Sequence, residues 1–163
     1  MIGTPVIDGL LLDVLADLEV EFERVSSAAY VVTLRGPRAL HVWLIGGEQD
    51  VAVEAFVCHV LDGAPVPAAH AYLLTRNRSL RGAHFALDEV GDVFLTGSLA
   101  LADVTTVAVD RLLAELWEVL VTDLPRLLTL LYGEQVPDKA LLDGAGRRAA
   151  GTPLWAPRRD ARR

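Results

Sequence analysis

The pattern of hydrophobic and polar residues predicts one long helix, between residues 105 and 132. Large apolar residues recur there every three or four positions, which is the spacing of an amphipathic helix packed on a core. The apolar positions are Val109, Leu112, Leu113, Leu116, Trp117, Leu120, Leu124, Leu127, Leu128 and Leu131, and the charged positions assigned to the opposite side are Asp110, Arg111, Glu115, Glu118 and Asp123. Because Pro125 lacks a backbone donor, we expect a kink near Asp123 or Leu124.

A second amphipathic helix is predicted at the start of the chain. Thr4 followed by Pro5 is typical of a helix N-cap and the first helical position. Apolar residues then repeat at three and four positions with Asp13 and Asp17 on the other side. This helix should end near Leu18 or Glu19.

Between the two helices the pattern changes to that of strands. Four runs rich in β-branched and aromatic residues, at 22–25, 30–34, 39–45 and 51–61, are separated by the turn pairs Ser26-Ser27, Gly36-Pro37 and Gly46-Gly47. They predict an antiparallel meander. The run 39–45 is apolar on both faces, so it should be a central strand covered on both sides or lying at an interface. Its Trp43 is either a core residue or part of a contact surface.

A short helix and a hairpin complete the predicted domain. Pro67 opens the helix, which runs to Asn77. Strands at 83–87 and 93–96 are joined by an acidic turn at 88–92, and Asp103 or Thr105 should cap the long helix. We therefore predict an α+β fold, an antiparallel sheet flanked by helices in the order α-β-β-β-α-β-β-α, as a single domain over residues 1–135.

Charge divides the chain into an acidic body and a basic tail. The net charge of −7 is the sum of −11 over residues 1–135 and +4 over residues 136–163. An acidic body is not expected to bind nucleic acid, since that requires a basic face. The Pro-, Gly- and Arg-rich residues 136–163 predict a disordered tail. Within it, Trp155 between Pro153 and Pro157 is either a short anchoring motif or a solvated side chain.

Composition places the protein among ordinary globular domains. Hydrophobic residues make up 52 % and charged residues 23 % of the 163 residues, and no apolar run approaches the roughly 20 residues of a membrane span. The first eight residues lack the features of a signal peptide. We therefore expect a cytoplasmic protein with no membrane partner. The single Cys58 excludes an internal disulfide.

The candidate chemistry is sparse. His41, His59, His70 and His84 are not spaced to pair with one another or with a carboxylate, so we interpret them as four separate histidines. The acidic turn residues Asp88, Glu89 and Asp92 are expected to supply turn geometry rather than to bind a cation. No nucleophile or phosphate-loop motif is present. We predict a protein that is not an enzyme, with no catalytic residue, metal or cofactor.

Three arginines form the single local basic group of the body. Arg76, Arg78 and Arg81 either satisfy helix carbonyls and pair with nearby carboxylates or anchor an acidic segment of a partner. Asn77, among them, should stop the helix or clasp the following loop.

A family resemblance rests on the residues around this group. Segments 73–77, 82–88, 91–95, 99–101 and 104–105 resemble the signature region of the YbjN family, whose fold is similar to that of type III secretion chaperones. The likeness extends over residues 7–132 in element order and over 73–110 in residue pattern. It implies a non-enzymatic domain that binds or regulates polypeptides, as a monomer or a homodimer. The family offers no catalytic residues.

Three functional hypotheses follow. The first is a chaperone-like or adaptor domain that binds a client polypeptide or a second copy of itself through an apolar surface, with Trp43, Arg76, Asn77, Arg78 and Arg81 as candidate binding residues. The alternative is a small-molecule sensor with a pocket between the sheet and the long helix, lined by groups such as His84 and Asp110. A transcription regulator is the third, for which only the Arg-rich tail could contact DNA.

Overall fold

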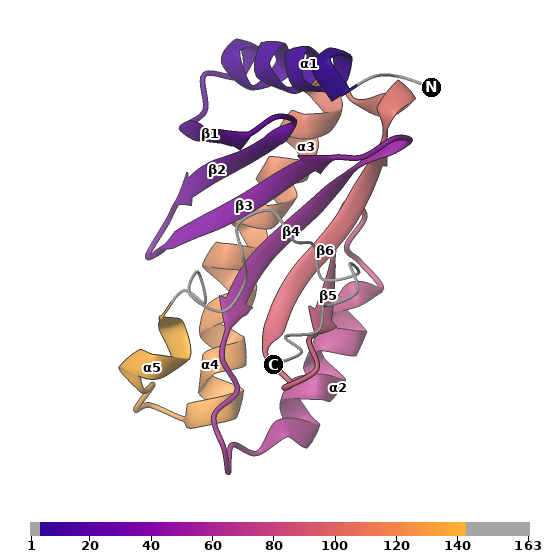
Figure 1. The fold of residues 1–163 in the computed structure, drawn as a ribbon. Helices are drawn as coiled ribbons and strands as arrows, with labels where there is room; N and C mark the ends of the chain where they lie inside the picture. The colour runs from indigo at the N-terminus through magenta and orange to yellow at the C-terminus, as the bar shows by residue number, and fades with distance from the viewer. Residues whose placement is uncertain (1–3, 143–163) are drawn as a thin grey trace, which may run out of the picture.

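The computed structural model describes residues 4–142 and shows a sheet with helices on one face (Figure 1). The strands are β1 (Phe22–Ser26), β2 (Ala29–Arg35), β3 (Ala39–Gly46), β4 (Asp50–Cys58), β5 (His84–Leu87) and β6 (Val93–Ala100). The helices are α1 (Thr4–Asp17), α2 (Val66–Asn77), α3 (Thr106–Glu118), α4 (Leu124–Tyr132) and the short α5 (Asp138–Leu141). A 3-10 turn, η1 (Leu101–Asp103), precedes α3, and a π-helical turn, η2 (Val119–Asp123), joins α3 to α4. The predicted α+β class is confirmed.

The six strands form one antiparallel sheet in the order β1-β2-β3-β4-β6-β5. The first four strands are a meander, and the β5–β6 hairpin joins it through β6. All four runs predicted for the meander form strands, so the sheet has one strand more than the predicted order α-β-β-β-α-β-β-α. The last run ends at Cys58 rather than at residue 61, because the Tyr132 hydroxyl donates to the His59 carbonyl (2.6 Å) and accepts from the Leu61 amide (3.0 Å).

One hydrophobic core fills the space between the sheet and the helices. Alternate strand residues point toward α1, α3 and α4, and most of them are fully buried. From the sheet they include Tyr30, Val32, Val42, Leu44, Val53, Ala55 and Leu95, and from the helices Leu11, Leu15, Leu116 and Leu127. Burial of these side chains, at about 1.5–3 kcal/mol for each large one, favours this two-layer arrangement.

The long helix predicted over residues 105–132 is interrupted by the π-helical turn η2, which ends two residues before Pro125. The Thr105 hydroxyl caps α3 by accepting from the Ala108 amide (3.2 Å). At η2 the hydrogen bond from Leu124 reaches back to Val119, five residues instead of four. The expected kink is thus a π-helical turn that ends just before Pro125, whose missing N–H leaves no donor for a regular bond there.

Two side chains of the long helix differ in burial from the prediction. Trp117 was assigned to the core stripe but is 47 % exposed, with its indole N–H donating to the Arg35 carbonyl (3.1 Å). Asp123 was assigned to the polar side but is 1 % exposed. It lies three residues after Leu120 and four before Leu127, so it shares their inward direction.

Four residues of the segment predicted to be a disordered tail form a short helix. Residues 138–141 form α5, whose Ala140 carbonyl accepts from the His59 amide (2.8 Å), while the Leu141 carbonyl accepts from Arg38 (2.7 Å). These bonds attach a segment that the composition alone assigned to a disordered tail. The remainder of the predicted tail, with Trp155, lies outside the described residues.

Within residues 4–142, none of the helices has both the length and the hydropathy needed to cross a lipid bilayer.

Candidate functional site

The sheet has a second face, on which no described helix packs (Figure 1). We call it the helix-free face. It is formed by the strand residues that alternate with the core residues, and its large members on the central strands are His41, Trp43, Ile45, Glu54, Phe56 and Phe94. Strand β3, predicted to be central and apolar on both faces, is indeed flanked by β2 and β4 and contributes Trp43 and Ile45 to this face.

Aromatic residues are concentrated in the middle of the helix-free face. Trp43, partly buried, lies opposite Val31 on one neighbouring strand and Glu54 on the other. Phe56 and Phe94 are cross-strand partners, with ring centroids 5.4 Å apart in an edge-to-face arrangement. Trp43 and Phe56 are partly exposed, whereas Phe94 is buried among its neighbours. Large apolar side chains that remain partly exposed on a sheet face make that face a candidate contact surface.

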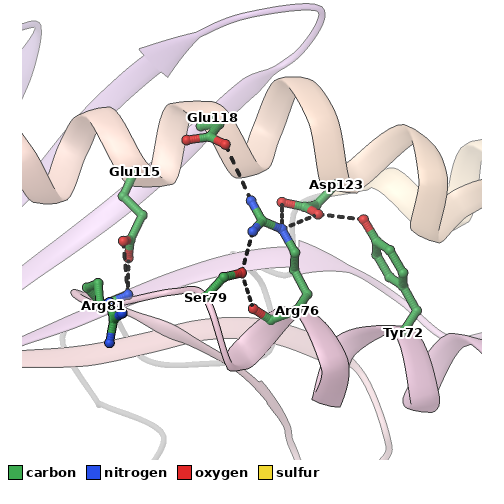
Figure 2. A network of polar contacts seen from close by, with 7 residues as sticks. All are labelled: Tyr72, Arg76, Ser79, Arg81, Glu115, Glu118 and Asp123. Carbon is green, nitrogen blue, oxygen red and sulfur yellow. Dashed lines mark hydrogen bonds and ion pairs between the residues drawn. The ribbon is translucent and has the colours of Figure 1, made fainter.

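The candidate basic group lies elsewhere, on the helix layer. There α2 packs beside α4, and a network of polar contacts joins it to the long helix (Figure 2). Asp123 is its centre: its carboxylate accepts from the Tyr72 hydroxyl (2.5 Å) and from Arg76 Nε (2.8 and 3.0 Å). Burial and the adjacent carboxylate raise the pKa of Tyr72 to about 12, so the hydroxyl remains a donor.

Arg76 is therefore engaged within the molecule. Besides Asp123, its guanidinium contacts Glu118 (3.4 Å) and the Ser79 hydroxyl (2.6 Å), and the hydrogen bond to Asp123 is the main cause that raises the pKa of Arg76 further. This is the pairing with nearby carboxylates that the sequence offered as one reading. Arg78 and Arg81 instead have exposed side chains.

Asn77 acts as a clasp. Its side-chain amide donates to the Phe85 carbonyl (3.1 Å) and accepts from the Phe85 amide (2.7 Å). These are the two backbone groups that a further strand would bind at the edge of β5. Asn77 thus covers part of that edge, which agrees with the predicted clasp of the following segment.

Glu115 holds the loop between α2 and β5 (Figure 2). Its carboxylate accepts from the amides of Arg81 (2.9 Å), Gly82 (2.8 Å) and Ala83 (3.2 Å). Three successive amides that point at one carboxylate form an anion-binding nest. The nest is occupied by the protein's own side chain.

Asp8 plays a comparable part at the other end of the sheet. It accepts from Arg24 Nη2 (2.6 Å), from the Ala28 amide (2.8 Å) and from the Tyr30 hydroxyl (2.8 Å), so it joins α1 to β1 and β2. These bonds, led by that from Arg24, lower the pKa of Asp8 from 3.8 to about 2.

The interpretation of four separate histidines is wrong for His59. Its Nδ1 lies 2.6 Å from Asp92 Oδ2, in a pair that is buried at both ends, and Asp92 Oδ1 accepts from the Val60 amide (3.0 Å). The partners are 33 positions apart, so spacing along the sequence cannot reveal them. Within the hairpin turn, the Asp88 carboxylate accepts from the amides of Val90 and Asp92, which is the predicted turn geometry.

Three observations concern the candidate chemical groups of the described residues. Residues 4–142 hold no group of three or more metal-binding side chains. Burial raises the pKa of the Cys58 thiol to about 12, which keeps it protonated and unreactive. His84 points from the helix-free face and Asp110 is exposed on α3, so these two, named as examples for the pocket hypothesis, do not converge.

The five predicted binding residues do not form one site. Trp43 belongs to the helix-free face, whereas the other four belong to α2 and the loop that follows it. Among those four, Arg76 and Asn77 make internal contacts, and Arg78 and Arg81 are exposed. The carboxylates Asp8, Asp92, Glu115 and Asp123, which organise the polar contacts, were missed because each has its partners more than ten positions away.

The chain is similar in sequence to uncharacterized proteins of mycobacteria. The chain is 42 % identical over 110 residues to an uncharacterized protein of Mycobacterium tuberculosis, a match that covers 66 % of this chain and 60 % of the relative. An uncharacterized protein of Mycobacterium leprae is 41 % identical over 108 residues, covering 65 % of this chain and 58 % of the relative. The chain thus spans less than two thirds of the length of these relatives.

Among solved structures, one similar chain comes from the heterodimeric complex ExoU-SpcU of the type III secretion system of Pseudomonas aeruginosa. It matches with a TM-score of 0.53 and 20 % identity, over 74 % of this chain and 96 % of that one. The likeness confirms the secretion-chaperone-like fold. Residues 9–128 match the sequence model of the YbjN family, described as "Putative bacterial sensory transduction regulator". This match covers the whole sheet and most of the helical layer, so the chain belongs to the YbjN family.

Proposed function

We propose that this protein is a non-enzymatic adaptor of chaperone-like type, which binds a polypeptide segment or a second copy of itself through the helix-free face. The observation that carries the proposal is the position of Trp43, Phe56 and Phe94. By the strand register they lie on the face opposite the core residues, with Trp43 and Phe56 partly exposed and Phe94 buried. No described helix packs on that face (Figure 1). An apolar face of this kind is stabilised by contact with another chain.

The comparisons support the proposal at a general level. The family description refers to regulation, and the structural relative with a similar fold was solved as part of a heterodimer. Both are compatible with a domain that acts through protein contacts. The binding residue proposed first is Trp43, and Arg78 and Arg81 form a second, separate candidate contact for an acidic segment. We expect the binding to take place in the cytoplasm.

The test uses a photo-crosslinking amino acid at Ser98, which is exposed on the helix-free face beside Ala52. The matched control carries it at Ala114, which is exposed on α3 in the helix layer. In living cells, crosslinks to a defined protein or to a second copy should form from position 98 and should be at least tenfold weaker from position 114. Equal yields from both positions, or no protein adduct from either, would contradict the proposal.

Substitution of tryptophan provides the second readout. Trp43→Ala should abolish the adduct from position 98, because it removes the largest apolar side chain of the face. Trp117→Ala removes an exposed tryptophan of the helix layer and should leave the adduct unchanged. Light scattering on the purified chain then distinguishes the two occupants, since only self-association gives a dimer without added protein.

A further inference from the structure

The helix-free face is acidic as well as aromatic. Among the strand residues that point from it, Glu23, Asp50 and Glu54 are acidic. Glu23 and Asp50 are exposed, and Glu54, which lies directly opposite Trp43, is buried. Arg35 is the one arginine or lysine of these strand positions, and it is paired with Glu21 (2.7 Å). The face therefore combines three carboxylates with three aromatic rings, a surface suited to a segment that carries both arginine and an apolar anchor.

The chain leaves the described fold at one end of the central strands. Arg38, just before β3, donates to the Leu141 carbonyl (2.7 Å) and to the Val57 carbonyl (3.4 Å). The His59 amide, just after β4, donates to the Ala140 carbonyl. These bonds fix residues 140–142 at the end of the two central strands, β3 and β4, which carry Trp43 and Phe56.

The residues that follow are long enough to cross the face. Residues 143–163 comprise 21 residues, which can span up to about 70 Å when extended. Strand β4, with nine residues, is only about 30 Å long. The segment can therefore run the full length of the sheet from its attachment at α5.

The composition of this segment is complementary to the face. Residues 143–163 contain six arginines and two aspartates, against the net negative charge of the rest of the chain. The arginines form pairs, Arg147-Arg148 and Arg158-Arg159 on either side of Leu154-Trp155, and Arg162-Arg163 beyond them. A tryptophan between arginine pairs presents an apolar anchor flanked by positive charge, and the nearby prolines favour an extended backbone that suits binding along a strand.

We propose that residues 143–163 dock on the helix-free face of the same chain, with Trp155 against the aromatic residues around Trp43 and with arginines opposite Glu54 and its neighbouring carboxylates. The segment then occupies in cis the surface on which the proposed function places a partner. Docking itself is independent of the proposed function, but the competition with a partner rests on it.

The test measures paramagnetic broadening of tryptophan indole signals in the full chain. A nitroxide is attached to a cysteine introduced as Ala161→Cys, and Cys58 does not compete for the label because it is fully buried. Trp43 reports on the helix-free face, and Trp117, in the helix layer, serves as an internal control. Docking predicts that the Trp43 signal is broadened several-fold more than that of Trp117.

Two substitutions probe the contacts. Trp155→Ala and Glu54→Gln should each reduce the excess broadening of Trp43, and 0.5 M salt should reduce it further because exposed charges are screened. Asp17→Asn, which changes an exposed carboxylate of α1, should have no effect. Equal broadening of Trp43 and Trp117, or broadening that Trp155→Ala leaves unchanged, would overturn the docking.

Crosslinking from position 98 separates this inference from the proposed function. If the segment competes with a partner, Trp155→Ala should increase the partner adduct several-fold. Strong Trp43 broadening with no partner adduct in any variant would contradict the proposed function and leave the docking in place. A strong adduct with equal broadening of both indoles would overturn the docking and leave the proposed function in place.

Discussion

The two faces of the sheet differ in chemistry although they are made by the same strands. In β3, Leu44 points to the helix layer and is fully buried, while the neighbouring Trp43 points to the helix-free face and is partly buried. The helix-covered face is mostly aliphatic, with Phe22, Tyr30, Phe85 and Arg24 as exceptions. The helix-free face mixes aromatic rings with carboxylates and histidine. This difference separates a face that builds the core from a face that we propose for binding.

The largest expected effect comes from comparing these two neighbours directly. Leu44→Ala should lower the free energy of unfolding by about 2–5 kcal/mol, because it leaves a cavity in the core. Trp43→Ala should lower it by less than about 2 kcal/mol, since it removes mainly cross-strand contacts. Urea denaturation of both variants measures the difference. Equal losses would show that the helix-free face contributes to folding as much as the core does.

The next effect concerns the attachment of α2 to the helix layer. Asp123→Ala should cost about 3 kcal/mol, at the lower end of the range for breaking a buried ion pair, because Arg76 keeps its contact with Glu118. Glu118→Ala removes only the exposed partner and should cost less than about 1 kcal/mol. Thermal and urea unfolding of the two variants would test this. Similar losses for both would contradict the central role of Asp123.

A smaller effect is expected at the edge of β5. Asn77→Ala removes both hydrogen bonds to Phe85 and should cost about 1–2 kcal/mol, with faster hydrogen exchange at the Phe85 amide. Asn77→Asp keeps the acceptor oxygen for that amide and should preserve more of its protection. If exchange at Phe85 is unchanged in the alanine variant, the clasp does not protect this edge.

The smallest effect is a dependence on pH at the α1 attachment. The pKa of Asp8 in the folded protein, about 2, lies below the ordinary value near 4, so its contribution to stability is present above pH 4 and is lost as pH falls toward 2. Asp8→Asn lacks this contribution at every pH. The difference in urea midpoint between the two proteins should therefore be larger at pH 6 than at pH 2.5. A constant difference would contradict the assignment.

Much of the fold was predictable because its elements follow simple periodicities. The amphipathic spacing located α1 and α3, and turn residues separated the strands of the meander. Strand order within the sheet was not predictable, since β6 pairs with β4 across an inserted helix and strand. Trp43 was recognised as lying in a strand with two apolar faces, but only the position of the helices shows which face it occupies.

The polar contacts could not be predicted for a different reason. A charged residue such as Asp123 is assigned to solvent unless its partner is known, and Tyr72 and Arg76 become its partners only when α2 packs on the long helix. The same holds for His59 and Asp92, which meet because β4 and β6 are neighbours. Local turn chemistry, as at Asp88, was predictable because donor and acceptor are close in sequence.

The pairing of β4 with β6 also has a consequence for the order of folding. The β1–β4 meander and the β5–β6 hairpin contain only local connections, whereas the seam between them joins residues as distant as Asp50 and Ala100. Closing such a long loop is slow relative to forming a hairpin, so the seam should form late. Phe56 and Phe94 face each other across it. The aromatic surface is therefore complete only in the fully folded chain. A partner that binds there would bind the folded chain and not its folding intermediates.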